Sequence, residues 1–124
     1  MERLQGAFYM IDETPESDKT DGCPHPRKTL NLFGHKKAQT EILDALKNEK
    51  IHHARLVCGS KGSGKATLVW KMARTLLTMD PLATISNHSN SPTNLNVAIE
   101  HPIYKRTLAL TEPKLHLLRR NWDP

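Results

Sequence analysis

An octapeptide near the middle of this chain of 124 residues carries the clearest chemical pattern. Its sequence, GSKGSGKA from Gly59 to Ala66, matches the phosphate-binding pattern G-x-x-x-x-G-K-[ST] at every fixed position except the last. In this pattern glycines let backbone N–H groups turn toward phosphate oxygens, the following helix adds the positive end of its dipole, and a lysine reaches the outer phosphates. The residues that we expect to contact a nucleotide on this basis are Gly59, Gly62, Ser63, Gly64, Lys65, Ala66 and Thr67.

The last position of the pattern weakens the expectation of hydrolysis. Ala66 stands where a serine or threonine hydroxyl normally ligates Mg²⁺. Thr67 follows directly, but one helical step rotates a side chain by about 100°, so its hydroxyl should not replace the missing ligand. We therefore expect ATP or ADP to bind weakly and with little need for Mg²⁺, and we assign no catalytic residue.

The seven histidines and two cysteines do not change this view. None of them has the paired C-x₂-C or H-x₃-H spacing that is typical of a zinc site. No metal site is predicted.

The segments around the octapeptide must position it. The apolar run before it predicts a strand over 55–58, and the helical pattern after it predicts a helix over 64–79 with Val69, Ala73 and Leu76 on its buried stripe. Pro81 ends this helix. A strand, a loop and a helix in this order are the context in which the pattern functions.

Three further elements are predicted from periodicity. Ala38, Ile42, Ala45 and Leu46 recur at helical spacing in residues 36–50. A helix over 103–110 is opened by Pro102, and a second strand is expected over 115–118. The polar stretch 82–96 is expected to be a solvated loop.

These elements predict the α/β class. Strand, helix and strand, with a phosphate loop between the first two, indicate the first strands and helices of a parallel sheet in an incomplete P-loop NTPase domain. Residues 1–28 are polar and rich in proline, so we expect an irregular arm, and residues 29–124 are expected to be the amino-terminal part of the nucleotide-binding domain.

The composition limits the partners and the cellular location that we expect for the chain. Its net charge of +5 and pI of about 9.4 suit contact with nucleic acid or an acidic partner, although no segment concentrates the basic residues. No run of eighteen apolar residues and no secretory signal is present in the sequence, so no membrane contact is expected. Two cysteines do not make a disulfide framework, which favours a cytoplasmic location.

From Pro24 onward the sequence resembles the start of bacterial clamp-loader AAA+ subunits, specifically the delta-prime subunits of DNA polymerase III. The stretches that carry the resemblance are PHPRKT at 24–29 leading to LFGH at 32–35, IHHARL at 51–56, GKATL at 64–68 after the rest of the phosphate loop, and TEPKLHLL at 111–118. The phosphate loop alone is generic, whereas the four stretches in this order are fairly specific.

The resemblance implies a role in DNA replication. Subunits of this family form part of the DNA polymerase III holoenzyme, a nucleotidyltransferase complex, and help to load the sliding clamp on primed DNA. The partners implied are the other clamp-loader subunits, the clamp and the primed DNA. Delta-prime subunits are mainly structural, and the segment at Phe33 and Gly34 would lie near the adenine. The sequence matches about the first third of the family's length, without the acidic strand, sensor residues or arginine finger.

Two alternatives remain open. The chain could be an active P-loop ATPase or kinase of another family, against which Ala66 and the missing acidic strand argue. It could also be a small basic module that binds nucleic acid without nucleotide chemistry.

Overall fold

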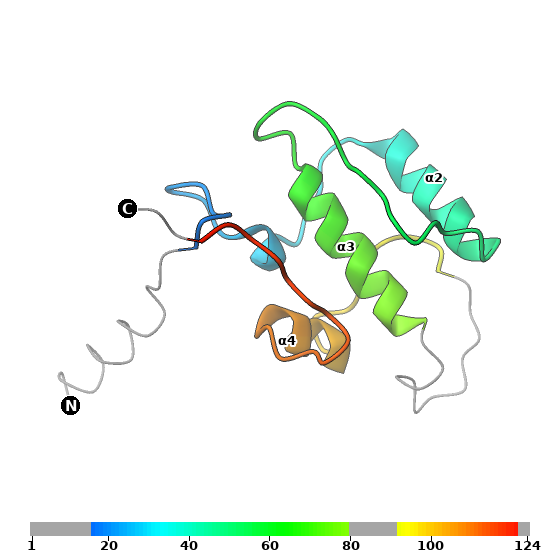
Figure 1. The fold of residues 1–124 in the computed structure, drawn as a ribbon. Coiled ribbons are helices and arrows are strands. Elements are labelled where there is room, and N and C mark those ends of the chain that lie inside the picture. Colours follow the sequence, from blue (N-terminus) through cyan, green and yellow to red (C-terminus); the bar gives the residue numbers. More distant parts are fainter. Residues whose placement is uncertain (1–15, 80–91, 122–124) are drawn as a thin grey trace. The chain divides into compact units, whose positions relative to one another are not determined.

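The computed structural model describes residues 16–79 and 92–121 and contains four helical elements in this part of the chain (Figure 1). A 3₁₀ turn, η1, spans Pro26–Lys28, and the α-helices are α2 (Lys36–Lys47), α3 (Lys65–Thr78) and α4 (Pro102–Leu108). The chain divides into two compact units, one formed by residues 26–116 and one by residues 1–25 with 117–124. All four elements belong to the first of these.

Helix α3 is the centre of the larger unit. It contacts η1, α2 and α4, and no other described element touches as many neighbours (Figure 1). One apolar cluster joins α3 to α2 and to the segment before α4; its buried members are Ile42, Leu46, Leu68 and Leu95. A helix held on several sides is a rigid support for the loop that precedes it.

Helix α2 follows the sequence prediction closely. Ile42 and Leu46, one turn apart, are the buried residues of the helix, and Ala38 packs against the same cluster. The helix ends at Lys47 instead of residue 50, because Glu49 adopts a positive φ of 52°. The amide of Lys50 then donates to the carbonyl of Ala45 at 2.9 Å, which closes the helix end.

Helix α3 is present as predicted, but its buried face is different. Val69 was predicted on the buried stripe and is 44% exposed, whereas Lys71, Arg74 and Thr75 are buried. The reason is that the face toward η1 and α4 meets hydrogen-bonding groups: Arg74 Nε donates to Thr107 Oγ1 at 3.0 Å. A polar face can be buried when its donors find acceptors.

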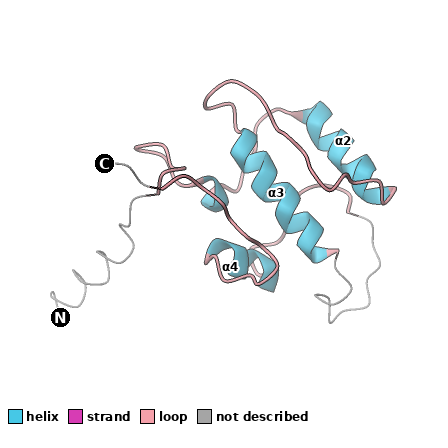
Figure 2. Ribbon diagram, in the orientation of Figure 1, coloured by secondary structure: helices cyan, strands magenta, loops and turns pink. Residues whose placement is uncertain are grey.

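The predicted parallel sheet is wrong for the described residues, in which no strand occurs (Figure 2). Residues 55–58 and 115–118 adopt no regular element; Leu56 is 89% and Leu118 is 94% exposed, and Cys58 is exposed as well. An extended segment becomes a strand only when a neighbour accepts and donates its backbone hydrogen bonds. No described segment pairs with either run, so the described part of the chain is helical and not an α/β P-loop NTPase domain of the AAA+ type.

The loop predicted over 82–96 falls mostly outside the described residues. Residues 92–96 are irregular as expected, but Leu95 is 1% exposed and belongs to the core cluster. The helix predicted after it is confirmed as α4. Its N-cap, His101, accepts a hydrogen bond from the amide of Ile103 through Nδ1 at 3.1 Å.

The smaller unit is held together by polar contacts. Asp18 accepts hydrogen bonds from His25 at 2.8 Å and from Arg119 at 2.9 Å, and Arg119 also pairs with Glu16 at 3.4 Å. Burial opposes ionisation of Asp18, but hydrogen bonds to its carboxylate, of which the bond from His25 has the largest effect, keep its pKa below the usual value. Residues 16–25 therefore form turns fixed by ion pairs within the segment expected as an irregular arm, of which residues 1–15 lie outside the described part.

Candidate phosphate-binding site

The glycine-rich loop forms a tight turn directly before α3. Gly62 and Gly64 have φ values of 78° and 91°, a region that side chains with a Cβ rarely adopt. The amide of Ser63 donates to the carbonyl of Ser60 at 3.2 Å, which closes the turn. The two positive φ values reverse the chain so that the loop meets the amino end of α3 (Figure 1).

The amides at this helix start have no acceptor among the described residues. Gly64 is the N-cap and offers no side chain, and the first helical bond runs from the Leu68 amide to the Gly64 carbonyl at 3.0 Å. The amides of residues 64–67 precede that bond and are the unpaired donors that every helix start leaves. Together with the helix dipole they form a concentration of positive potential at the loop.

Lys65 lies over the loop. Its Nζ donates to the carbonyl oxygens of Gly59 at 3.2 Å and Ser60 at 3.0 Å. Both acceptors are neutral, so they satisfy two donors of the ammonium group but do not compensate its charge. The side chain is half-buried, and both of its hydrogen bonds lie at the surface.

Ser63 supplies a buried hydroxyl that has no partner. Its Oγ is inaccessible and makes no hydrogen bond, which among buried polar side-chain atoms of the described residues is unusual. A Cβ placed on Gly59 would lie 3.2 Å from this oxygen, so the hydroxyl sits inside the loop and not outside it. The hydroxyl is a donor left without an acceptor inside the loop, and the other donors of the loop, the amides at the start of α3 and Lys65, fit the phosphate group of a nucleotide.

The segment before α2 lies against the loop. His35 Nε2 donates to the carbonyl oxygen of Ser63, and a Cβ on Gly64 would meet Leu32 Cδ1 at 3.1 Å and His35 Nε2 at 3.7 Å. Because a carbonyl oxygen only accepts, Nε2 carries the proton. Phe33, between these two contacts in the sequence, leaves its side chain 85% exposed. The segment with Phe33 and Gly34 thus adjoins the phosphate loop. Two segments must be neighbours if one is to contact the base and the other the phosphates of the same nucleotide.

His35 and Leu32 are contacts that the sequence alone did not single out. The Leu-Phe-Gly-His stretch was noted for its resemblance to a family, and its direct contact with the loop depends on the way α2 packs on α3. The positive φ of 56° at His35 turns its ring toward Ser63. A positive φ at a single residue cannot be recognised from the spacing of residue types in the sequence.

The position that normally holds a metal ligand has no oxygen. Ala66 is exposed at the first turn of α3, and Thr67 is buried at 8% exposure, which turns its hydroxyl away from solvent. Among residues 16–79 and 92–121, no group of three histidine, cysteine, aspartate or glutamate side chains is arranged to hold a metal ion. No helix in that same part of the chain is long and apolar enough to cross a membrane.

Comparison with known proteins gives no neighbour for this chain: no family model matches the sequence, and neither curated proteins nor solved structures match it significantly.

Proposed function

We propose that this chain binds the phosphate groups of ATP or ADP weakly through residues 59–65, and that it serves in the bacterial cytoplasm as a delta-prime-like subunit of the DNA polymerase III clamp loader. In this role it helps to load the sliding clamp on primed DNA and is mainly structural. The partners are the other clamp-loader subunits, the clamp and the primed DNA through the complex.

The single observation that carries the nucleotide part is the donor set at the start of α3. Unpaired amides, the Lys65 ammonium group and the buried Ser63 hydroxyl meet at one loop, and no carboxylate of the described residues pairs with Lys65. Backbone amides at a helix start and a lysine are the groups that hold phosphate in many proteins. Three independent donors at one place favour an anion over a neutral ligand.

Weak binding without turnover follows from the residues that are missing. Ala66 offers no oxygen to Mg²⁺, and hydrolysis of a nucleotide depends on that ion to neutralise charge on the phosphates. The nucleotide therefore has a structural role, in which the bound phosphate orders the loop and the start of α3. No residue of the chain is assigned to catalysis.

The clamp-loader part is supported by the order of four sequence stretches and by one contact between them. The Leu-Phe-Gly-His stretch and the phosphate loop, the first and third of these stretches, are joined by the hydrogen bond from His35 to Ser63. Exposed apolar side chains are also available to partner subunits; among the described residues Leu118, Leu56 and Phe33 are the most exposed.

Isothermal titration with ADP and ATP, with and without Mg²⁺, tests the nucleotide part. We expect a dissociation constant of tens of micromolar or weaker, about the same without Mg²⁺, because no hydroxyl ligates the ion. Lys65→Ala should weaken binding at least about tenfold. Lys61→Ala, in the same loop but not at a fixed position of the pattern, is the matched control and should bind as the unchanged chain does.

Two results would refute this view and point elsewhere. Strong turnover that requires Mg²⁺ would favour an active ATPase or kinase of another family. Binding of primed DNA with a steep dependence on salt, and no binding of nucleotide, would favour a basic nucleic-acid module.

Co-elution tests the assembly part. The full chain is mixed with purified delta and gamma-type clamp-loader subunits and passed over a sizing column, with Phe33→Ser as the variant and Val69→Ser, also an exposed apolar position, as the control. We expect the unchanged chain to co-elute with the other subunits. Separate elution of every protein at micromolar concentration would contradict the clamp-loader role and leave the phosphate site standing.

A further inference from the structure

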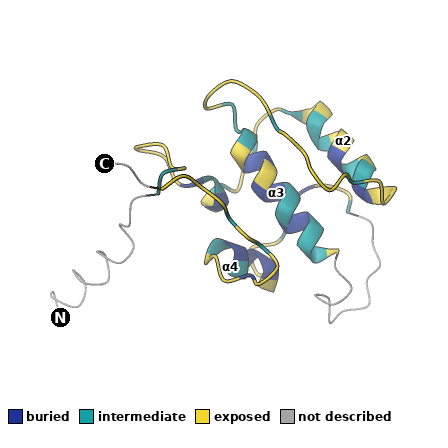
Figure 3. Cartoon of the chain, in the orientation of Figure 1, coloured by how far each residue is buried: buried dark blue, intermediate teal, exposed yellow. Residues whose placement is uncertain are grey.

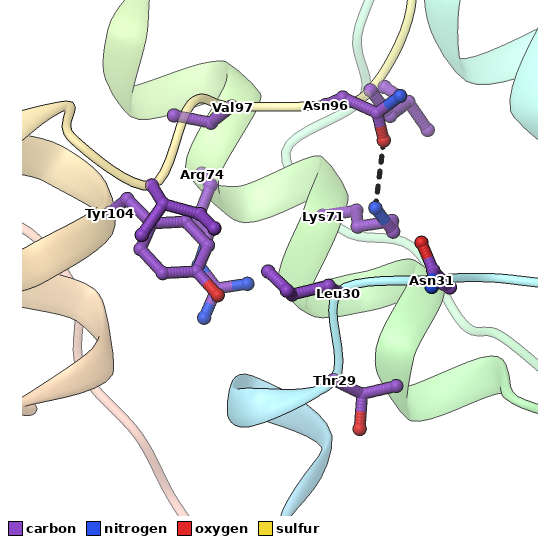
Figure 4. A pocket seen from close by; sticks show the side chains of 10 residues that line it. Thr29, Leu30, Asn31, Lys71, Arg74, Asn96, Val97 and Tyr104 are labelled. Atoms are coloured by element: carbon purple, nitrogen blue, oxygen red, sulfur yellow. Dashed lines mark hydrogen bonds between the residues drawn. The ribbon is translucent and has the colours of Figure 1, made fainter.

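A second region of the larger unit holds two buried cations around a cavity, well away from the phosphate loop along α3. The cavity has a volume of about 250 Å³ and lies between the middle of α3, the residues after η1, the residues before α4, and α4 itself (Figure 4). Lys71 and Arg74, on successive turns of α3, line it and are 8% and 3% exposed. Lys71 follows Lys65 by six residues, or about 9 Å along a helix, so the two regions are distinct.

Neither cation has a carboxylate partner among the residues that the structure describes. Lys71 Nζ donates to Asn96 Oδ1 at 2.8 Å, a neutral amide oxygen, as Figure 4 shows. An ammonium group has three donors, and this bond uses one of them. Burial, and to a lesser extent the charge of Arg74, lower the pKa of Lys71, which means that the folded chain disfavours its positive form as long as the charge is uncompensated.

The groups that hold Arg74 in place in the described part of the chain are neutral. Its Nε donates to Thr107 Oγ1 at 3.0 Å, its Nη2 donates to the carbonyl oxygen of Arg27, and its guanidinium lies 4.4 Å from the centroid of the Tyr104 ring. Hydrogen bonds and a ring face fix the orientation of a guanidinium but leave its net charge in place. The Arg74 guanidinium therefore brings a positive charge of fixed orientation to the cavity.

Apolar side chains line the same cavity. Leu30 and Val97 lie near the Tyr104 ring and the two cations (Figure 4), and Ile99 belongs to the lining as well, beside the polar residues Thr29, Asn31 and Asn96. Leu30 and Ile99 are 47% and 52% exposed, so the apolar part of the lining reaches the surface and a molecule can enter there. A cavity lined by both cationic and apolar side chains matches a molecule that has an anionic head on a compact apolar body.

We propose that this cavity, the Lys71–Arg74 pocket, binds a small organic anion whose carboxylate or phosphate group contacts Lys71 and Arg74 and whose apolar body lies against Leu30, Val97 and Tyr104. Buried charges in proteins are paired as a rule, because an isolated buried charge is strongly unfavourable. Two buried cations, with no carboxylate among the described residues that line the cavity, are explained by a ligand that brings the negative charge.

The test is an NMR titration of the full chain that follows the Arg74 Nε–H and Asn96 side-chain amide signals. The probes are sodium benzoate and phenyl phosphate, and benzyl alcohol is the neutral compound of similar shape. We expect saturable shifts of both signals with at least one anion at millimolar concentration, and binding of benzyl alcohol at least about tenfold weaker, which corresponds to loss of a charge-assisted contact. A preference for benzoate assigns a carboxylic acid and a preference for phenyl phosphate a phosphate ester; either outcome supports the pocket.

Variants separate this pocket from general attraction of anions and from the phosphate loop. Lys71→Met keeps most of the length of the side chain, and it should lower the affinity for the anion at least about fivefold. Lys47→Met, at an exposed lysine at the end of α2, and Lys65→Ala, in the phosphate loop, should leave the shifts of the Arg74 and Asn96 signals unchanged. The proposal is overturned if neither anion shifts the two signals saturably below about 50 mM, if benzyl alcohol binds equally well, or if Lys71→Met binds as the unchanged chain does.

Discussion

Helix α3 carries two positively charged regions that are built in contrasting ways. At its start the donors are mainly backbone amides in an exposed glycine-rich loop, with one half-buried lysine (Figure 3). At its middle the cations are the side chains of Lys71 and Arg74, buried and oriented by residues from three other segments. The Lys65 side chain contributes little to packing, so it can change with little effect on stability. The Lys71–Arg74 pocket is part of the structural core, so its chemistry and the stability of the fold are coupled.

The largest effect on the free energy of unfolding is expected in the buried region, at Arg74. Arg74→Ala should lower the free energy of unfolding by about 3 kcal/mol, because the Arg27 carbonyl loses a charged donor and the stack on Tyr104 is lost. Lys65→Ala, in the exposed loop, should change it by less than about 0.5 kcal/mol. Urea unfolding followed by far-ultraviolet circular dichroism measures both. Equal effects of the two substitutions would remove the contrast.

Substitution of two glycines in the exposed loop should lower stability by different amounts. Gly64→Ala should destabilise the chain by about 2 kcal/mol, since a positive φ is combined with a close approach of Leu32 at 3.1 Å. Gly62→Ala, at a φ of 78° but with nothing within 4 Å of the new methyl group, should lose about 1 kcal/mol from backbone strain alone. The same unfolding measurement applies. A larger loss for Gly62→Ala would mean that Leu32 and His35 do not pack on the loop as described.

Arg106 is paired with a carboxylate, unlike Lys71 and Arg74, and the stability that this pair contributes should depend on pH. Arg106 Nε donates to Glu112 Oε2 at 2.7 Å, and this hydrogen bond, more than any other contact, lowers the pKa of Glu112 below its ordinary value of 4.5. A lowered folded-state pKa stabilises the chain above about pH 4.5, and this contribution disappears as the pH falls through the folded-state pKa. Glu112→Gln should therefore lose about 1 kcal/mol at pH 7 and much less at pH 3.

The control for this experiment is Glu41→Gln, on the exposed side of α2. It should show no difference between the two pH values beyond that of the unchanged chain. If Glu112→Gln lost as much stability at pH 3 as at pH 7, its effect would come from packing and not from its charge.

The smallest expected effect concerns Lys71 itself. Because burial and the charge of Arg74 lower the pKa of Lys71, its positive charge destabilises the folded chain at neutral pH. Lys71→Met should raise the free energy of unfolding by about 0.5 kcal/mol, despite the lost bond to Asn96. Thermal unfolding at pH 7 measures the change. A decrease of that size or more would indicate that the bond to Asn96 outweighs the burial of the charge.

The two regions also differ in how far the sequence predicts them. The phosphate loop is a local pattern of glycines and one lysine, and the helix after it has a clear period, so both can be recognised in a single segment. The pocket assembles Leu30, Lys71, Asn96 and Tyr104, which are far apart in the sequence and share no spacing. A buried lysine within a helix looks like a surface residue until its neighbours are known.

The wrong predictions have a related cause. Runs such as Leu56–Val57–Cys58 are apolar enough for a strand, but pairing with a neighbour, which decides whether a strand forms, is not encoded in the run itself. The prediction that Val69 is buried was wrong, although Leu76 of the same stripe packs against the core. Apolar periodicity does not account for arginine and lysine on a buried face, where their donors find acceptors. By contrast, α2 buries an ordinary apolar face, and there the periodicity of Ile42 and Leu46 was sufficient.

The most direct test of the phosphate site is a titration of the ¹⁵N-labelled chain with ADP in the absence of Mg²⁺, read at individual backbone amides. If the amides at the start of α3 hold the phosphates, the largest shifts will occur at Gly62, Gly64, Lys65 and Ala66, and they will vanish in Lys65→Ala. Shifts concentrated at Lys71, Arg74 and Asn96 instead, or no saturable shift at any amide of the loop, would contradict a phosphate site at residues 59–65.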